Sequence, residues 1–225
     1  MLRAIDRSVK VKPQFKGVFT VQHLSGILKA CESYPLPLIY KTAYLFPYFG
    51  FLRISNLFPP SIKSFSCKKH LCIGDSIVNS SDLVVVIKWS KTVQATYQGS
   101  YIVLPKFANS SLCPWQHFQK LASAYPVHSN LPCFSKVGFL LVEYMLRQHL
   151  RNIVIQLGLD PAIYTFHTFR RSGATLAHNL DIPIDQIKRH GTWSSDSVLS
   201  YIVDDPQRAS ALSSSLTRFF NHNMS

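Results

Sequence analysis

The stretch "YTFHTFRRSGATLAHN", residues 164–179, places one histidine and two arginines within five residues, at the start of an apolar helical pattern. His167 and Arg170 are three residues apart, so on a helix both side chains project from one face. An imidazole beside a guanidinium offers N–H donors that suit phosphate oxygens, and the helix N-terminus adds backbone N–H groups. A bare H-x-x-R pattern is more often a capped helix with solvated charges. The stretch therefore predicts a helix and raises the question of a phosphate site.

The composition indicates a folded, strongly basic protein. Hydrophobic residues make up 47% of the 225, which is ample for a buried core, and 24 Lys and Arg against 11 Asp and Glu give a net charge of +13. This excess favours a polyanionic partner, with nucleic acid first and an acidic membrane surface second. The five cysteines are odd in number and scattered, which is typical of free thiols in a reducing intracellular compartment.

Neither a membrane span nor a secretory signal is expected from the apolar segments. The longest apolar run, "VGFLLVEYML", is interrupted by Glu143 and followed by Arg147, which favours a core helix over a membrane span. The first 16 residues carry charge but contain no apolar segment of the kind that secretory signals need.

Hydrophobic periodicity predicts an α+β fold that is mostly α, with a small three-stranded antiparallel sheet after the second helix. Residues 1–15 are expected to form a basic arm or linker, residues 16–205 the domain, and residues 206–225 a tail with one weak helix. The expected strands are 62–65, 83–90 and 100–105, the last two as a hairpin. The expected helices are 20–33 with Thr20 as N-cap, 37–50, 114–125, 136–158, 168–180, 183–190 and 194–203.

Four further residues could carry chemistry, although each has a simpler explanation by itself. Arg53 ends a strongly apolar stretch, where a charge needs either a partner or a route to water. Lys91 lies at the expected hairpin tip, where polar residues are usually just exposed. Trp193 and Tyr201 lie near the last expected helix, where aromatic residues are most often packed in a core.

A zinc site is a weaker interpretation of the sequence "CKKHLC". It contains Cys67, His70 and Cys72, which are residue types that bind zinc. Their spacing is not a usual zinc pattern, however, and no second pair of ligands lies near them in the sequence. We therefore expect no bound metal.

The order of these features resembles the catalytic domain of tyrosine recombinases, the phage-integrase type. The resemblance extends from about Phe15 to Asp205. It rests on four segments, "FGFLRISNL", "IKWSKTVQ", "TFHTFRRSGAT" and "GTWSSDSVLSYI", which follow the order of the family's motifs. The set is most similar to the recombinases of eukaryotic mobile elements of the DIRS and Crypton kind.

The resemblance implies a role for each matching residue. Tyr201 matches the nucleophile, and Trp193 matches a later position held by His or Trp, for which His190 is a weaker candidate. Arg171, next to the H-x-x-R pair, is expected to face DNA or to pack rather than to take part in chemistry. The implied catalytic set is Arg53, Lys91, His167, Arg170, Trp193 and Tyr201.

The function implied by the resemblance is that of a site-specific DNA recombinase or integrase. Tyr201 would form a 3′-phosphotyrosyl bond with double-stranded DNA, without a metal, ATP or another cofactor. The implied assembly is a homotetramer on DNA in the nucleus, in which residues 206–225 form a helix that docks on a neighbouring subunit through Phe219 and Phe220. The resemblance implies neither a membrane nor a small-molecule substrate.

Two departures from the family pattern leave alternatives open. Asn56 occupies a position where the family usually has Glu or Asp, and residues 1–15 are too short for the helical domain that clamps the other face of the DNA. We therefore expect a catalytic fragment, a naturally short member or a truncated remnant. A domesticated DNA-binding protein with little catalysis is one alternative, and a type IB topoisomerase, which relaxes supercoils through the same chemistry, is another.

Overall fold

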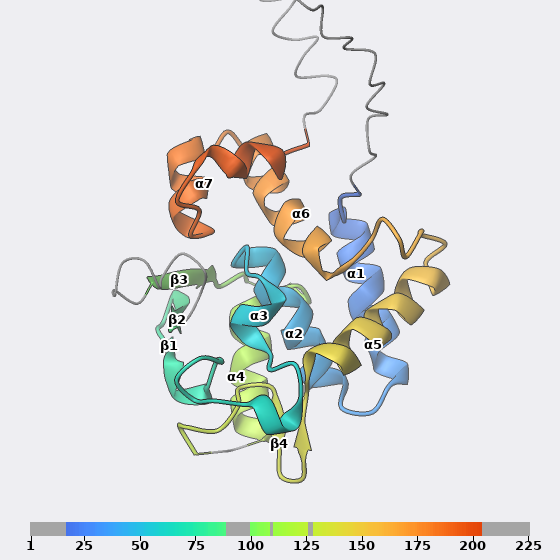
Figure 1. Ribbon diagram of the computed structural model, residues 1–225, viewed down its shortest axis with the longest axis vertical. Helices are drawn as coiled ribbons and strands as arrows, with labels where there is room; N and C mark the ends of the chain where they lie inside the picture. Colours follow the sequence, from blue (N-terminus) through green and yellow to red (C-terminus); the bar gives the residue numbers. More distant parts are fainter. Residues whose placement is uncertain (1–16, 89–99, 109, 126–127, 204–225) are drawn as a thin grey trace, which may run out of the picture.

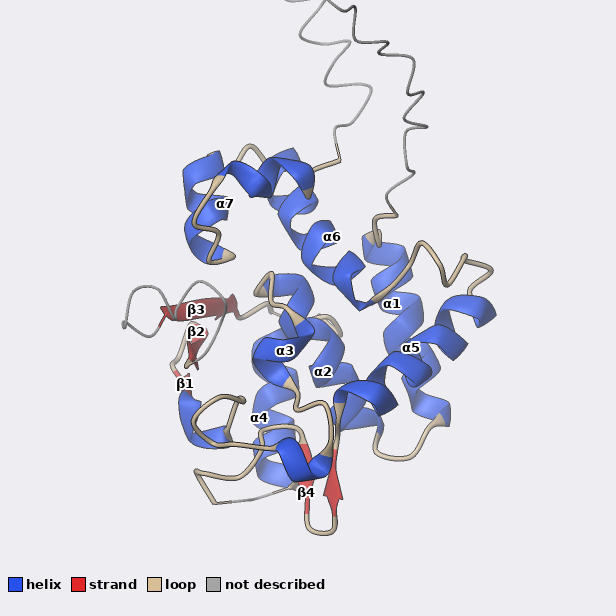
Figure 2. Cartoon of the chain, viewed as in Figure 1, coloured by secondary structure: helices blue, strands red, loops and turns tan. Residues whose placement is uncertain are grey.

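The computed structural model describes residues 17–88, 100–108, 110–125 and 128–203, and helices are the main regular structure in these ranges (Figure 1). Strands occur within them as one three-stranded sheet and one short hairpin (Figure 2). This confirms the predicted α+β, mostly α, class. The helices are α1 (Val21–Ala30), α2 (Pro37–Phe49), α3 (Ile54–Leu57), α4 (Pro114–Ala124), α5 (Glu143–Gln156), α6 (Phe166–Asn179) and α7 (Ile184–His190). The strands are β1 (Ser76–Val78), β2 (Asp82–Ile87), β3 (Ser100–Pro105), β4 (Ser135–Lys136) and β5 (Phe139–Leu140), and the 3₁₀ turns include η1 (Cys31–Ser33), η2 (Ile62–Ser64), η3 (Ile73–Asp75) and η5 (Asp196–Ser200).

The first two predicted helices are confirmed, and their first residues explain where they begin. Thr20 caps α1, since its hydroxyl accepts from the His23 N–H at 3.2 Å. Pro37 opens α2 at a position where a helix needs no N–H. Most of α2 is buried, so this helix forms the centre of the core (Figure 1). None of the helices in the described ranges is long and apolar enough to cross a lipid bilayer.

The predicted hairpin is confirmed, but the predicted third strand was placed wrongly. Strands β2 and β3 pair in antiparallel register, with Val85 opposite Ile102. The third strand is β1, and residues 62–65 form the turn η2 instead. Two prolines precede this turn, and the Ser64 hydroxyl accepts from the Ser61 N–H at 2.9 Å, which closes the backbone locally.

The predicted helix over 136–158 is wrong in its first third. Residues 135–140 form the hairpin β4–β5, and α5 begins only at Glu143. Gly138 has φ of 76°, in the left-handed region that ends regular helical structure. The apolar run that suggested a helix instead folds back as a hairpin, in which Val137 is 92% exposed, and only Leu141 and Val142 after it are buried. Periodicity alone does not separate a helix from a strand in so short an apolar run.

The predicted helix over 194–203 is also wrong, because only the single turn η5 forms there. Ser195 caps this turn, and the Ser200 hydroxyl donates to the Ser197 carbonyl at 2.8 Å. Serine side chains compete for backbone groups in this way and disfavour a continuous helix. Tyr201 therefore follows a short turn, with its ring packed against a small second core.

Two buried clusters hold the described elements together, and α6 contributes to both. The main core joins α1, α2, α4, α5 and the inner face of the sheet to Phe166 and Phe169 of α6. The second core lies between α6, α7 and η5, and consists of Phe51, Ala174, Ile187, Trp193 and Val198. Helix α6 leads from the helical body to α7, which lies above β3 in the view of Figure 1.

Gly173 allows α6 to pass directly over the end of α2. A Cβ atom at this position would lie 2.0 Å from the Tyr48 carbonyl oxygen and 2.6 Å from the Phe51 ring. A backbone oxygen cannot move aside as a flexible side chain can. The absence of a side chain at Gly173 therefore sets the distance between the two helices.

We expect Gly173→Ala to lower the free energy of unfolding by about 1–3 kcal/mol, because α6 must move away from α2. Urea unfolding of the purified variant measures this loss. Gly26→Ala in α1 is the matched control, since its nearest neighbour is the mobile Leu157 Cδ2 atom at 3.1 Å. Equal stability of the Gly173 variant and the wild type would contradict the close packing.

His149 of α5 is buried and neutral. It lies between Tyr40 and Tyr44 of α2 and Tyr34, the residue that follows η1. The Tyr44 hydroxyl lies 2.7 Å from His149 Nδ1, and the Tyr40 ring stacks on the imidazole at 3.9 Å. Tyr34 covers the ring from another side at 4.1 Å. Burial lowers the pKa of His149 to about 4.

The pKa of His149 predicts that stability is lost in acid. Its folded-state pKa lies below its unfolded value, so the neutral form stabilises the fold above about pH 6.5 and this contribution is lost as pH falls towards 4. The pKa values of His70, His117 and His190 are lowered in the same direction. As pH is lowered from 8 to 4, the melting temperature of His149→Gln should decrease less than that of wild type. His128 is exposed, so the melting temperature of His128→Gln should follow wild type.

Candidate functional site

Arg170 is fully buried on α6 and joins two loops that are far apart in the sequence. Its Nη1 donates to the Phe51 carbonyl before α3, and its Nη2 donates to the Gly191 carbonyl after α7 at 2.9 Å. Both loops have strained backbone, since Phe51 has φ of 48° and Thr192 has φ of 56°. The guanidinium therefore holds two strained loops against one helix.

Trp193 and Tyr201 complete a cluster around this guanidinium. The Trp193 ring lies 3.7 Å from Arg170 Cζ, and the Tyr201 ring lies 5.5 Å from it. Tyr201 also lies edge-on to Trp193 at 5.2 Å and 4.8 Å from the His167 ring. A side chain at Gly191 would meet the indole at 1.8 Å, so this position must be glycine. The fold thus brings together four of the six predicted site residues.

Arg53 is the fifth predicted residue in this cluster. It precedes α3, and its charge is close enough to lower the pKa of Arg170. The buried Asn56 side chain accepts from the Arg53 N–H at 3.0 Å and so caps the short helix. Asn56, which departs from the Glu or Asp usual in the family pattern, thus helps to fix the backbone of Arg53.

Three buried donors in the cluster have no hydrogen-bond acceptor among the described residues. They are Arg53 Nη1, Arg170 Nε and Trp193 Nε1. A buried N–H without an acceptor costs about 1–3 kcal/mol, and more when it belongs to a charged group. An anion placed between these donors would supply the missing acceptors.

The electrostatics of the cluster are dominated by arginine. Burial, and then Arg53, lower the pKa of Arg170 to about 9. His167 reaches the surface, but the protein that covers the rest of its ring lowers its pKa by excluding water. Nearby positive charges lower this pKa further, to about 4, in the order Arg171, Arg170, Arg53 and Arg147. The imidazole is therefore neutral at pH 7 and lies at the open side of the cluster.

His190, the weaker candidate for the second His/Trp position, has a different environment. Its Nε2 lies 2.7 Å from the Phe49 carbonyl, and its ring packs edge-on against Phe51 at 4.7 Å. Trp193, in contrast, contacts both Arg170 and Tyr201. Arg171, expected to face DNA or to pack, is half-buried and donates to the Gly17 carbonyl at 3.2 Å.

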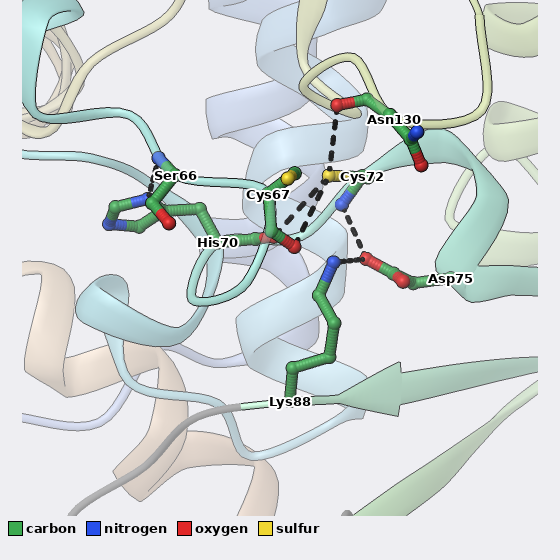
Figure 3. Close-up of polar contacts among 7 residues, drawn as sticks. All are labelled: Ser66, Cys67, His70, Cys72, Asp75, Lys88 and Asn130. Carbon is green, nitrogen blue, oxygen red and sulfur yellow. Dashed lines mark hydrogen bonds and ion pairs between the residues drawn. The ribbon is translucent and has the colours of Figure 1, made fainter.

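The remaining predicted site residue, Lys91, lies outside the described residues. Lys88, at the end of β2, forms an ion pair with Asp75 Oδ2 at 2.5 Å. The same carboxylate oxygen accepts from the Cys72 N–H at 2.7 Å (Figure 3). Lys88 is therefore held by an ion pair with a residue of η3, the turn that precedes β1.

The residues weighed as zinc ligands make other contacts. His70 Nδ1 accepts from the Ser66 N–H at 3.0 Å, and the Cys72 thiol lies 3.4 Å from the Asn130 carbonyl (Figure 3). Within the part of the chain that the structure describes, no three His, Cys, Asp or Glu residues form a group that could hold a metal ion.

The largest cavity near the cluster is apolar and is not the candidate site. It has a volume of about 520 Å³ and lies between β3, α6 and α7, with Phe49, Leu176 and Ile187 in its walls. Phe51 and His190 line this cavity, and the Phe51 carbonyl accepts from Arg170, which is not among the lining residues. The cavity offers few donors, so the polar cluster around Tyr201 is the better candidate for an anionic ligand.

Sequence reasoning missed the backbone part of the site. The backbone carbonyls of Phe51 and Gly191 position Arg170, and they could not be recognised in the sequence, because every residue has a carbonyl. Gly191 was a usable signal, because a glycine permits close approach of another group to the backbone, as the Trp193 ring does here.

The similarity of this chain to known proteins is found in its structure and not in its sequence. No protein-family model matches the sequence, and no curated protein matches it. The XerH site-specific recombinase, bound to its difH substrate in a pre-cleavage complex, aligns with a TM-score of 0.60 and 16% identity over 88% of this chain and 53% of that chain. A lambda integrase dimer bound to a COC' core site gives 0.58 and 17% over 84% and 48%. The Tn1549 transposon integrase in complex with transposon right-end DNA gives 0.63 and 15% over 92% and 67%.

These similarities confirm the predicted fold of tyrosine recombinase and integrase catalytic domains. The chain spans about half the length of the XerH and lambda integrase chains that it matches.

The buried role of Arg170 predicts that lysine cannot replace it. One ammonium cannot reach both the Phe51 and Gly191 carbonyls while stacking on Trp193, so we expect Arg170→Lys to lower the free energy of unfolding by about 2–4 kcal/mol. Urea unfolding followed by tryptophan fluorescence measures this loss. The exposed Arg189→Lys, at an ion pair with Asp185, is the control and should change stability by less than about 0.5 kcal/mol. A stable Arg170→Lys protein would contradict the bridging role.

Proposed function

We propose that this chain is the catalytic domain of a site-specific DNA recombinase or integrase, which cleaves and rejoins DNA through a tyrosine. The observation that carries the proposal is a group of three buried donors without acceptors: those on Arg170 and Trp193, whose side chains contact the Tyr201 ring, and that on Arg53, whose charge acts on Arg170. A DNA phosphate placed against Tyr201 would accept from all three. The fold, the order of the sequence motifs and the net charge of +13 support the same conclusion.

In the proposed reaction, the Tyr201 oxygen attacks the scissile phosphorus and forms a 3′-phosphotyrosyl bond. The bond from phosphorus to the 5′-oxygen breaks, and that oxygen leaves as a hydroxyl after taking up a proton. A 5′-hydroxyl of a partner strand reverses the step and releases the tyrosine. One phosphodiester bond is exchanged for another, so no ATP is consumed.

The cluster suits the demands of this step. A phenol is a poor nucleophile at neutral pH, and its proton must leave as it attacks. His167 is neutral at pH 7 and its ring is 4.8 Å from Tyr201, so it can accept this proton. Arg53, Arg170 and Trp193 would stabilise the charge on the non-bridging oxygens, an effect often worth about 3 kcal/mol per donor.

Several parts of the proposal rest on the sequence resemblance. Lys91 is proposed to protonate the leaving 5′-oxygen. Residues 16–205 are proposed as the catalytic unit, residues 1–15 as an arm, and residues 206–225 as a tail exchanged between subunits through Phe219 and Phe220. The proposed assembly is a homotetramer on double-stranded DNA, and an origin in a eukaryotic mobile element would place it in the nucleus.

A DNA-binding protein that keeps the fold with little catalysis is the second candidate. It is favoured by Asn56, a buried amide that caps α3 at the position where the family carries an acid. An amide supplies no negative charge to orient a neighbouring cation during the reaction.

We expect the protein to form a covalent adduct with DNA that Tyr201→Phe abolishes while DNA binding is retained. Duplexes would first be selected from a random library with the Tyr201→Phe protein, then prepared with nicks that trap the cleaved strand. Wild-type protein on these substrates should give an adduct on a denaturing gel. Trp193→Phe, which keeps the ring but removes the N–H, should slow adduct formation about 100-fold.

The matched control is Trp115→Phe. The indole N–H of Trp115 donates to the Asn79 carbonyl, away from the cluster, so this variant should form the adduct at the wild-type rate. Binding by wild type with no adduct on any selected duplex would favour the DNA-binding candidate. An adduct accompanied by plasmid relaxation without strand exchange would identify a topoisomerase.

A further inference from the structure

Thr175 on α6 is buried and binds the chain segment that carries Tyr201. Its hydroxyl donates to the Tyr201 carbonyl at 3.4 Å and accepts from the Val203 N–H at 3.2 Å. These partners lie 26 and 28 residues further along the chain. One side chain therefore connects the second half of α6 to the backbone of Tyr201 and of the residue two positions after it.

The hydroxyl of Thr175 is used differently from that of its neighbour Ser172. A buried hydroxyl within a helix commonly donates to the carbonyl four residues earlier, and Ser172 does so with the Thr168 carbonyl at 2.7 Å. A hydroxyl has a single proton to donate, and Thr175 directs it to the Tyr201 carbonyl. Thr175 thus holds a distant segment with a group that usually serves its own helix.

The other contacts of the Tyr201 segment do not fix its backbone to α6 in the same way. The Tyr201 N–H donates to the Val198 carbonyl at 2.9 Å, but this hydrogen bond lies within the turn that η5 forms. Val198 is buried in the second core, and the Tyr201 side chain packs partly against that core. Apolar contacts of this kind are not directional. The two hydrogen bonds of Thr175 therefore supply the direction in which the tyrosine backbone faces the helix.

Helix α6 also carries two residues that lie against the Tyr201 ring. This ring is 4.8 Å from the His167 ring and 5.5 Å from Arg170 Cζ. Thr175 follows His167 by about two turns of the helix. The backbone of Tyr201 is thus attached to the later part of α6, while its ring lies against residues nearer the N-terminus of the same helix. A single helix therefore sets the place of the phenol relative to the imidazole and the guanidinium.

We propose that Thr175 is a positioning residue for Tyr201: its hydroxyl holds the Tyr201 segment on α6, so that the phenol lies against His167 and Arg170. The proposal rests on the proposed DNA-cleaving function, in which this phenol attacks a phosphate. Thr175 acts through the backbone and takes no part in the exchange of bonds. Its effect on the rate is large because a reacting atom misplaced by about 1 Å can slow a reaction about 100-fold.

Amide hydrogen exchange of Val203 in the full-length chain without DNA tests the attachment itself. Thr175→Val keeps the branched shape but removes the hydroxyl, so the Val203 N–H loses its acceptor and should exchange at least about tenfold faster than in wild type. Thr175→Ser keeps the hydroxyl and should stay within about threefold of wild type. Equal exchange of Val203 in wild type and Thr175→Val would overturn the proposal. Thr175→Ala is a second variant without the hydroxyl, should the valine variant fail to fold.

The rate of adduct formation on saturating nicked DNA then measures the effect on the reaction. This rate should fall about 10- to 100-fold in Thr175→Val and less than about threefold in Thr175→Ser, with the DNA affinity of both variants unchanged. A role in packing alone predicts the opposite order, because valine fills the space of threonine and serine does not. A wild-type rate in Thr175→Val, or a lower rate in Thr175→Ser than in Thr175→Val, would overturn the positioning role.

The matched control is Thr42→Val, the same substitution at another buried threonine within a helix. The Thr42 hydroxyl donates to the Leu38 carbonyl at 2.7 Å, within α2. This variant should keep the wild-type exchange of Val203 and the wild-type rate of adduct formation, and a loss of rate equal to that of Thr175→Val would overturn the specific role of Thr175. Failure of wild type to form any adduct would refute the proposed function, whereas the exchange of Val203 would still decide whether Thr175 holds the segment.

Discussion

The burial of one positive charge is the constraint on which the rest of the C-terminal half depends. Transfer of a guanidinium out of water costs several kcal/mol unless its donors are satisfied and its faces are covered. Arg170 meets most of this demand with two backbone carbonyls and the Trp193 ring, while its Nε has no acceptor among the described residues. Both carbonyl loops adopt left-handed backbone at a residue other than glycine, which costs free energy and persists only when the surroundings impose it. The strained loops and the buried charge therefore stabilise each other.

The same arrangement leaves positive charge unbalanced within the site. The groups that shift the pKa of Arg170 and His167 are other arginines and a tyrosine, and three buried donors lack acceptors in the described residues. Such a cluster lowers the stability of the free protein. Proteins commonly accept this loss where a site must bind a ligand of opposite charge. His167 is exposed and Arg170, three residues later on α6, is buried, so the His167 end of the cluster is the one that solvent reaches.

The sequence predicted those elements whose beginnings have a local chemical cause. Thr20 and Pro37 mark the first two helices, and β-branched runs mark the hairpin of β2 and β3. The prediction failed between residues 136 and 142, where an apolar run suggested a helix but Gly138 turns the chain into a hairpin, and where serines reduce a helix to one turn. For the site, the order of motifs identified the side chains that the fold brings together. The carbonyls that position Arg170 could not be predicted, because every residue carries one.

The turn that carries Tyr201 differs mechanically from the helix that carries its neighbours. Helix α6 is fastened on two sides, by Gly173 against α2 and by Ser172 against Phe19. The element η5 is one turn of 3₁₀ helix with Val198 as its buried residue. Displacement of Tyr201 requires this turn to yield and the hydrogen bonds of the Tyr201 and Val203 backbone with Thr175 to break, while Arg170 keeps its place on α6. In the proposed reaction, a DNA strand bonded to Tyr201 would be attached through this short, deformable segment, and it could move towards a partner strand while His167 and Arg170 keep their positions on α6.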